Sequence, residues 1–428
     1  MQVTAIILFA STYVLLLSFP KVRAYIALAS AAIFVILGIL PISKVIATVD
    51  WNVIFMIAGT MGIVGFFIES KMPSLLADHI INLVPNVKWA IIALALFAGI
   101  ISAFIDNVAT VLMIAPVAVT IAKKLKISPV NSVIAIAVSS NLQGAATLVG
   151  DTVSILLGGH AGLSFNDFFF LEGKPGLFWI VEAGALVATL VLVIVFRKEK
   201  DPIDKQELTK VEDYFPTVLL VGVVLLLIIN SFIPGKYKPD AIEGLINGII
   251  CMTLFLIGLI RKLIKTKDTE TFIEALKSID YDTILLLAGL FIVIGGITEA
   301  GLVKEISKIF VKVSGDNVFL IYSLVVWASV LFSAFIDNIP YVATMLPVVG
   351  EISSIIGVEA NLLYFGLLIG ATLGGNITPI GASANITGLG ILRKEGYDVS
   401  APTFMKISVP FTLSAVVTGY LLIWFIWS

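Results

Sequence analysis

The six-residue string SAFIDN occurs twice in this chain, once at Ser102–Asn107 and again at Ser333–Asn338. The two copies lie 231 residues apart, and further matches keep almost the same spacing. Asp50, Trp51, Gly59, Gly65 and Glu69 match Asp280, Tyr281, Gly289, Gly295 and Glu299 at 230, and Pro116, Thr147 and Gly150 match Pro347, Thr378 and Gly381 at 231. A nearly constant offset over about 100 residues marks a duplicated unit. The chain is therefore predicted to consist of two halves that fold alike.

The composition restricts the environment in which these halves can fold. The chain is 59% hydrophobic and only 13% charged, with a mean hydropathy of +1.08. Soluble domains are about half apolar and about a quarter charged. The sequence therefore predicts an all-α membrane protein and excludes a soluble enzyme.

About ten segments have the roughly 20 mostly apolar residues that a spanning helix needs. They lie near 4–20, 22–40, 52–69, 131–157 and 176–196 in the first half, and near 214–233, 241–260, 283–299, 360–391 and 407–427 in the second. Five is an odd number, so the halves are predicted to be inverted repeats, a recurrent plan of secondary transporters. The expected organisation is a first repeat at 1–196, a cytoplasmic linker at 197–213 and a second repeat at 214–428.

Two other apolar stretches, near 89–122 and 318–356, are too long for one helix and carry Asp-Asn in their middle. We predict that each is a re-entrant hairpin, one in each half. Four short spans stay open as an alternative, because an even number of extra crossings leaves the sidedness unchanged. With the basic 197–213 segment inside, this threading puts 20 of the 27 Lys and Arg residues on the cytoplasmic side. That bias is typical of a multi-pass protein of the cytoplasmic (inner) membrane.

Four polar breaks interrupt the apolar segments: the two hairpin tips, and the spans at 131–157 and 360–391. Irregular backbone at membrane depth occurs only where it lines a cavity or is buried in protein. We therefore predict that the breaks form the substrate and ion site. Its predicted residues are Asp106, Asn107, Thr110, Asn141, Gly144, Thr147, Gly150 and Asp151 in the first half, and Asp337, Asn338, Gly375, Asn376, Thr378, Gly381, Ser383 and Asn385 in the second.

Asp106 and Asp337 stand out, because a carboxylate at membrane depth is costly and by default indicates a functional site. With Asn107 and Asn338 they are predicted to hold Na⁺ in exchange for a proton. The alternative is that each aspartate caps a hairpin helix, a role for which Asp is well suited. Asp151 has no acidic counterpart, since Ala382 takes its repeat position. It either tunes one ion site or is solvated in a loop.

The functional prediction is ion-coupled secondary transport, and more narrowly Na⁺/H⁺ exchange. It rests on the acidic hairpin tips and on the expectation that no basic residue lies at membrane depth. The alternative substrates are arsenite, which is mostly neutral at pH 7, and anions such as oxyanions or dicarboxylates; a channel is a third class. No GxxxxGK[ST] motif is present, so the energy is expected from an ion gradient. No nucleic-acid partner, no enzymatic activity and no cofactor besides the coupling ion, Na⁺ or H⁺, are expected.

At these residues the chain resembles the ion transporter superfamily, in the branch that holds the arsenite permease ArsB, NhaD-type Na⁺/H⁺ antiporters and the melanosomal P protein. SAFIDNIPYVATMLPV and GGNITPIGASANITGLG are similar to P protein segments, and TLVGDTVS resembles the TxIGDPPN element without its prolines. The related sodium–dicarboxylate carriers have Ser-Asn-Thr at the hairpin tips, where this chain has Asp-Asn. The resemblance implies a homodimer in which a transport domain moves past a scaffold domain in an elevator motion.

Overall fold

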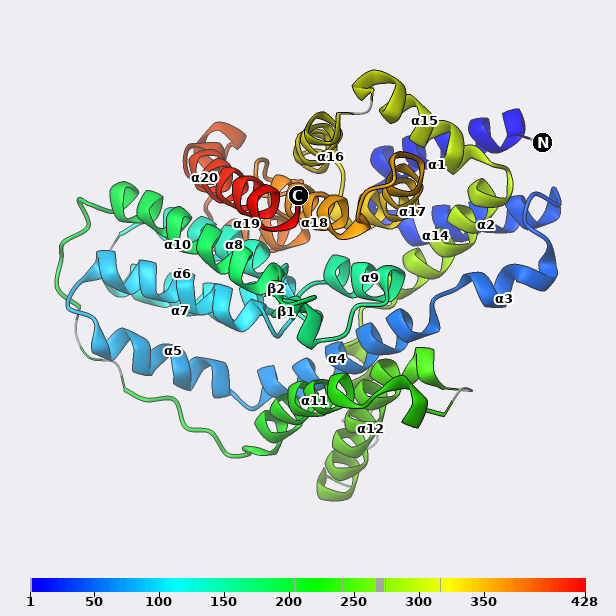
Figure 1. Ribbon diagram of the computed structural model, residues 1–428. Coiled ribbons are helices and arrows are strands. Elements are labelled where there is room, and N and C mark those ends of the chain that lie inside the picture. Colours follow the sequence, from blue (N-terminus) through cyan, green and yellow to red (C-terminus); the bar gives the residue numbers. More distant parts are fainter. Residues whose placement is uncertain are drawn as a thin grey trace.

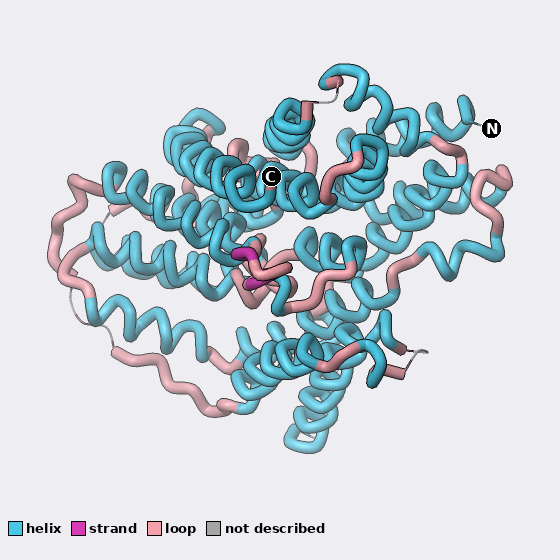
Figure 2. The backbone as a smooth tube through the Cα atoms, viewed as in Figure 1, coloured by secondary structure: helices cyan, strands magenta, loops and turns pink. Residues whose placement is uncertain are grey.

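The computed structural model describes residues 2–125, 127–203, 205, 207–239, 242–266, 273, 275–315 and 317–428. Residues 204 and 206 of the expected linker therefore lie outside the described part. Helices make up almost all of it, with one two-stranded ribbon of β1 (Phe170–Leu171) and β2 (Lys174–Pro175) (Figure 2). The prediction of an all-α fold is confirmed.

The helices of the first half are α1 (Gln2–Ser18), α2 (Arg23–Ile36), α3 (Val45–Thr48), α4 (Trp51–Glu69), α5 (Met72–Leu83), α6 (Val87–Ser102), α7 (Asn107–Leu125), α8 (Val130–Gly144), α9 (Thr152–Ala161) and α10 (Leu177–Val195). Those of the second half are α11 (Phe215–Phe232), α12 (Ile246–Thr266), α14 (Tyr281–Glu299), α15 (Leu302–Ser314), α16 (Val318–Ser333), α17 (Asn338–Ile356), α18 (Ala360–Gly374), α19 (Ser383–Lys394) and α20 (Ala401–Trp427). Short 3₁₀ turns cover Pro20–Val22, Ile42–Lys44, Asn166–Phe168, Gly235–Tyr237 and Glu243–Leu245.

Within the described residues, eight helices are long and apolar enough to cross a membrane, or up to ten if each of two bent pairs counts as one span. One bent pair is α1 with the helix that follows it, at 110°. Pro20 begins the turn between them, and proline lacks the backbone donor that a continuous helix would need. The other bent pair is α15 with α16.

Two helices, α5 and α15, were not among the predicted elements. Their first residues, Met72 and Leu302, are 230 apart, so they are themselves part of the repeat. Each is short and mixes apolar with polar residues, as in LVKEISKIFVKVS of α15. A search for long apolar runs misses such helices, because they lack the uniform hydrophobicity of a span.

The two halves interlock by exchanging helix partners. The second half's α12 packs along α4, and the first half's α2 packs along α14 (Figure 1). Glycines permit both contacts: a Cβ on Gly59 would lie 2.5 Å from the carbonyl carbon of Cys251, and one on Gly289 would lie 2.7 Å from that of Ala27. Small residues let membrane helices approach closely, and Gly59 and Gly289 are repeat partners.

The polar breaks lie in the other part of each half. There α6 packs against α8 and α16 against α18, while α10 and α20 lie side by side (Figure 1). The breaks fall between α6 and α7, α8 and α9, α16 and α17, and α18 and α19. Residues at or next to all four breaks line one cavity.

Candidate functional site

Asp106 occupies the break between α6 and α7. Its Oδ1 accepts hydrogen bonds from the backbone N–H groups of Val108 at 3.0 Å and Ala109 at 3.1 Å. These are donors that the first turn of a helix leaves without a partner. Asp106 therefore caps α7, as the capping interpretation expected, and it also lines a cavity described below. The two roles coexist in one side chain.

Asn107 ties the same break to the broken helices. Its Nδ2 donates to Asn141 Oδ1 at 2.9 Å, and Asn141 Nδ2 in turn donates to the carbonyl of Thr372 at 2.7 Å. In the opposite direction, Asn376 Nδ2 donates to the carbonyl of Val138 at 2.9 Å. These buried amides therefore hold α8 and α18 together where each helix ends.

Thr147 and Thr378 make the same contact in the two halves. Thr147 Oγ1 donates to the carbonyl of Ala103, and Thr378 Oγ1 donates to that of Ala334. Both donors and both acceptors are related by the 231-residue offset. Each threonine thus joins the unwound part of a broken helix to the backbone of a hairpin break, which is a structural role.

Gly150 and Gly381 allow the chain segments to meet at these breaks. A Cβ on Gly150 would lie 2.6 Å from the carbonyl oxygens of Gly144 and Ser102, and one on Gly381 would lie 2.6 Å from the carbonyl oxygen of Gly375. Such distances leave no room for any side chain. The glycines predicted from the repeat are therefore required by backbone packing.

A cavity of about 400 Å³ opens beside the breaks. Its wall includes one face of α4, the start of α7, the start of α9 and the segment 277–283. The predicted site residues that line it are Asp106, Asn107, Asp151, Asn338 and Ser383. Both halves of the repeat therefore contribute polar groups to one chamber, which is large enough for a small solute with water.

Asp151 lies in this cavity and is only 4% exposed. Its Oδ2 is buried without a hydrogen-bond partner among the described residues. The interpretation that Asp151 is solvated in a loop is therefore wrong. A buried carboxylate oxygen without a donor is costly unless it binds a proton or a cation.

Asp337, at the break before α17, has a different environment from Asp106. Its Oδ1 accepts from the backbone N–H of Ile339 at 3.1 Å, and its Oδ2 lies 3.3 Å from Ser383 Oγ and 2.6 Å from Arg23 Nη1. Arg23 is the first residue of α2. The functional prediction expects no basic residue at membrane depth, and the structure places Arg23 against one of the two aspartates on which that prediction rests. Sequence reasoning missed Arg23 because its acidic partner lies 314 residues away.

Lys277 is the second cation that the sequence analysis did not place at the site. It lines the large cavity together with Asp280 and Thr283, next to the start of α14. Asp280 caps that helix by accepting from the Thr283 N–H at 3.1 Å. Among the described lining residues, three carboxylates therefore face one cation.

A smaller cavity of about 210 Å³ lies on the other side of Asp337. Tyr13 and Arg23 line it, and Tyr13 Oη donates to the carbonyl of Pro340 at 2.7 Å and hydrogen-bonds Thr344 Oγ1. Two helices of the first half thus contact the start of α17 and the break before it. The equivalent break before α7 shows no such ion pair among the described residues.

The remaining predicted residues are not part of the wall of the large cavity. Thr110 Oγ1 donates to the carbonyl of Asp106 at 3.0 Å, and Asn385 Nδ2 donates to the carbonyls of Gly375 and Thr378, each at 3.1 Å. Ser154, the repeat partner of Asn385, hydrogen-bonds the carbonyl of Gly144 at 3.4 Å. Several buried oxygens still lack a partner among the described residues: Ser333 Oγ, Thr372 Oγ1, Asn376 Oδ1 and Asn385 Oδ1. Neutral oxygens of this kind are the ligands of hard cations.

Comparison with known proteins gives one family. The family model described as "Citrate transporter" matches residues 13–370. An uncharacterized transporter of Mycobacterium tuberculosis is 33% identical over 437 residues, covering 99% of this chain and 98% of that protein. The P protein of Homo sapiens is 28% identical over 483 residues, covering 93% of this chain and 56% of that protein.

Two solved transporter structures share the fold. The YdaH transporter of Alcanivorax borkumensis superposes with a TM-score of 0.59 at 12% identity, covering 89% of this chain and 86% of that one. MtrF of Neisseria gonorrhoeae, described as one of a class of antimetabolite efflux pumps, gives a TM-score of 0.56 at 16% identity, covering 89% and 82%. At these identities the likeness concerns the fold alone.

Proposed function

The chain belongs to the citrate transporter family, and we propose that this secondary transporter exchanges Na⁺ for H⁺. The observation that carries the proposal is the shared position of Asp106 and Asp151, which line both the large cavity and a small hollow beside it. Two carboxyl groups in one buried chamber repel each other when both are charged. A proton or a cation between them relieves that repulsion, so the two species compete for one place.

Neutral oxygens near the two carboxylates support Na⁺ over a divalent metal. Among the residues that the structure describes, no group of three or more His, Cys, Asp or Glu side chains could hold a metal ion. Amide and hydroxyl oxygens are plentiful, and Asn107 and Asn338 lie in the cavity wall. A singly charged ion requires fewer carboxylates than Ca²⁺ or Mg²⁺ does.

The two hairpin aspartates have different roles in this proposal. Asp337 already has a counter-cation in Arg23 at 2.6 Å, whereas Asp106 has no ion-pair partner among the described residues. Asp106 and Asp151 therefore form the exchange site. The Asp337–Arg23 pair, together with the Tyr13 contacts, holds the second hairpin in the present conformation.

For the architecture, we propose inverted repeats at 1–196 and 214–428, joined by the linker at 197–213, with two re-entrant hairpins. The helices α6–α9 and α16–α19 form the moving unit, and α1, α2, α4, α11, α12 and α14 form the scaffold. The described ion pairs support the threading. In this threading Lys44 and its ion-pair partner Glu299 both lie outside. The pairs Lys262–Glu69 and Lys123–Glu395 both lie on the cytoplasmic side. No described ion pair of these three joins opposite sides.

The same threading assigns a direction to the cavity. Lys277, Asp280 and the end of α4 at Ile68 line it, and all three belong to the side that carries most of the basic residues. The conformation is therefore inward-facing, and elevator movement of the hairpins would carry the site to the other side. By the resemblance described above, the working unit is a homodimer in the cytoplasmic membrane.

Transport in proteoliposomes that enclose a pH-sensitive dye tests the exchange directly. Na⁺ or Li⁺ gradients are expected to move protons, and K⁺ is expected to be inactive. The variant Asp151→Asn should abolish the signal, while Asp280→Asn, which alters the lining carboxylate that caps α14, should leave most of it. Equal activity of all three proteins would contradict the assignment of the exchange site.

Anion transport is the second candidate, and Arg23 and Lys277 are the observations that favour it. Both cations lie beside the chambers at the breaks, and the family description names citrate. In this case a carboxylate or oxyanion, or arsenite as a neutral solute, would occupy the cavity. Uptake of labelled citrate, dicarboxylate or arsenite without any proton movement driven by Na⁺ would favour this function over exchange.

A further inference from the structure

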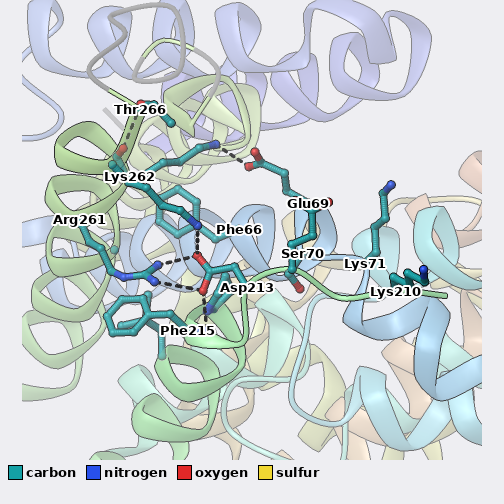
Figure 3. Close-up of a pocket in the computed structure, with 15 residues that line it drawn as sticks. Phe66, Glu69, Ser70, Lys71, Lys210, Asp213, Phe215, Arg261, Lys262 and Thr266 are labelled. Atoms are coloured by element: carbon teal, nitrogen blue, oxygen red, sulfur yellow. Dashed lines mark hydrogen bonds and ion pairs between the residues drawn. The ribbon is translucent and has the colours of Figure 1, made fainter.

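A second pocket lies away from the four breaks, where the linker between the halves meets α4, α11 and α12. Its volume is about 270 Å³ (Figure 3). The charged residues that line it are Lys71, Lys210, Arg261, Lys262 and Lys265 on the basic side, and Glu69, Glu212 and Asp213 on the acidic side. Five cations face three carboxylates, so the described lining carries a net charge of +2.

Three of the cations already have a carboxylate partner, two of them the same one. Asp213 accepts from Arg261 Nη1 at 2.7 Å and from Lys265 Nζ at 3.3 Å, and Lys262 pairs with Glu69. Lys71 and Lys210 project from the side opposite α12 (Figure 3), and neither forms an ion pair with a described residue. Asp213 serves two of the paired cations, and Glu212 also lines the pocket, so the net charge of +2 is shared between the paired cluster and the side of Lys71 and Lys210. These two exposed lysines are the cations that can meet an outside anion.

Lys71 has an unusual backbone for its residue type. Its φ is +59°, in the left-handed region that side chains with a Cβ rarely adopt. The repeat position in the second half is Gly301, with φ +73°, which tolerates this conformation without cost. The first half thus keeps a lysine where its own duplicate has the residue that the backbone favours. Non-glycine residues held in this region concentrate at functional sites.

The N-terminus of α5 adds to the positive electrostatic potential beside the pocket. Lys71 is the N-cap residue of α5, and its side chain makes no capping hydrogen bond. The partial positive charge of a helix start attracts anions. In α5 the Met72 N–H donates to Ser70 Oγ at 3.3 Å and Pro73 has no N–H, so this start contributes its charge rather than free donors. The start of α11 is different, since Asp213 Oδ1 accepts from the Phe215 N–H at 3.0 Å. The α11 end of the pocket therefore carries a carboxylate, whereas Lys71 lies at the α5 end.

The apolar part of the lining indicates the kind of anion. It is formed by Phe66, Phe215, Pro216 and Leu219. Beyond it, α11 and α12 are the least buried of the candidate spans, with 28% of their apolar windows buried. Exposed side chains such as Val218 and Leu225 continue along α11 from the pocket. A charged rim above an apolar helix face matches a molecule with a charged head and hydrocarbon chains.

We propose that this pocket binds the phosphate headgroup of an anionic membrane phospholipid, held by Lys71 and Lys210. The pocket contains the linker residues Lys210–Asp213, so the bound lipid joins the end of the first half to the start of the second. Its acyl chains lie along α11 and α12. The site is independent of which ion the transporter carries.

The test is thermal unfolding of the purified full chain in neutral detergent, titrated with short-chain phosphatidylglycerol, short-chain phosphatidylcholine or inorganic phosphate. Phosphatidylglycerol is expected to raise the Tm, and phosphatidylcholine and phosphate are expected to have much smaller effects. In the double variant Lys71→Gly/Lys210→Gln, the phosphatidylglycerol concentration that gives half of the Tm shift should be at least roughly tenfold higher than in the wild type, because two interfacial lysines are lost.

Matched variants distinguish a loss of lipid binding from a loss of folding. Lys71→Gly introduces the residue of the second repeat, so the Tm without lipid should be unchanged or higher. Lys21→Gln, which removes an exposed lysine of the same predicted membrane side, should respond like the wild type. Equal shifts with phosphatidylglycerol and phosphatidylcholine, an unchanged response of the double variant, or stabilisation by phosphate alone would overturn the proposal.

Discussion

Arg23 Nη1 lies 2.6 Å from Asp337 Oδ2, joining the first turn of α2 to the hairpin break before α17. The two side chains are only 22% and 18% exposed. Their contact crosses from a helix of the proposed scaffold to a hairpin of the proposed moving unit. In an elevator transporter such a contact must break whenever the site changes sides, so its strength contributes to the choice between conformations.

The ion pair predicts strong coupling between its two residues. Arg23→Gln leaves Asp337 partly buried without its cation. We expect the free energy of unfolding to fall by about 3 kcal/mol, the lower end of the range for breaking a buried ion pair. The double variant Arg23→Gln/Asp337→Asn should recover part of this loss, because no charge is left unpaired. Thermal and denaturant unfolding of the four proteins measures the coupling. Strictly additive effects would show that the pair does not stabilise this conformation.

Substitutions of Asp106 separate its capping role from its charge. Serine caps helices about as well as aspartate does, so the free energy of unfolding of Asp106→Ser should lie within about 0.5 kcal/mol of the wild-type value. Its exchange rate should fall below about a tenth of the wild-type rate, which corresponds to about 1.4 kcal/mol or more. Parallel measurements of Tm and of Na⁺-driven proton movement check this. Full transport by the serine variant would leave Asp106 with the capping role alone.

The repeat allowed the breaks and their glycines to be predicted before any contact was known. The identical offset of Gly150 and Gly381 reflects identical packing, since a Cβ on Gly150 would lie 2.6 Å from the carbonyl oxygen of Gly144, and one on Gly381 would lie 2.6 Å from that of Gly375. The same reasoning found Thr147 and Thr378, although their hydroxyls bind backbone rather than a solute. A repeat identifies positions that both halves need, and shared needs include structure as well as transport.

Features that break the symmetry could not be predicted in this way. Arg23 meets Asp337 through the exchange of α2 and α12 between the halves, a tertiary arrangement that leaves no local pattern in the sequence. The burial of Asp151 depends on where α9 begins relative to the cavity, and the sequence left its environment open. The helices α5 and α15 were missed because they are short and amphipathic.

The tight glycines predict severe destabilisation by a single methyl group. Gly150→Ala or Gly381→Ala should each cost about 3 kcal/mol, the upper part of the range for overpacking, because the new Cβ meets backbone that cannot move aside. Gly390→Ala in α19 is the matched control, since nothing lies within 4 Å of its built Cβ. It should be neutral or stabilising by up to about 1 kcal/mol. Unfolding midpoints of the three variants provide the comparison, and equal midpoints would refute the packing argument.

Acid should weaken the contact between the linker and α12. Hydrogen bonding to Arg261 lowers the pKa of Asp213 from 3.8 to about 2. A carboxylate with a lowered folded-state pKa stabilises the fold fully above its unfolded pKa, and that contribution is lost as the pH falls through the folded value. We expect the Tm difference between wild type and Asp213→Asn to be constant above about pH 4.5 and to shrink between pH 4 and pH 2. A difference that does not change over this range would show that Asp213 is not ionised in its pair.

The most direct test of the account is proton movement in proteoliposomes that contain the wild type, Asp106→Ser or Asp151→Asn. The account predicts that an Na⁺ gradient changes the internal pH with the wild type and leaves it unchanged with both variants, although both remain folded. Proton movement by either variant at the wild-type rate, or no response of the wild type to Na⁺ or Li⁺ alongside uptake of citrate, would contradict it.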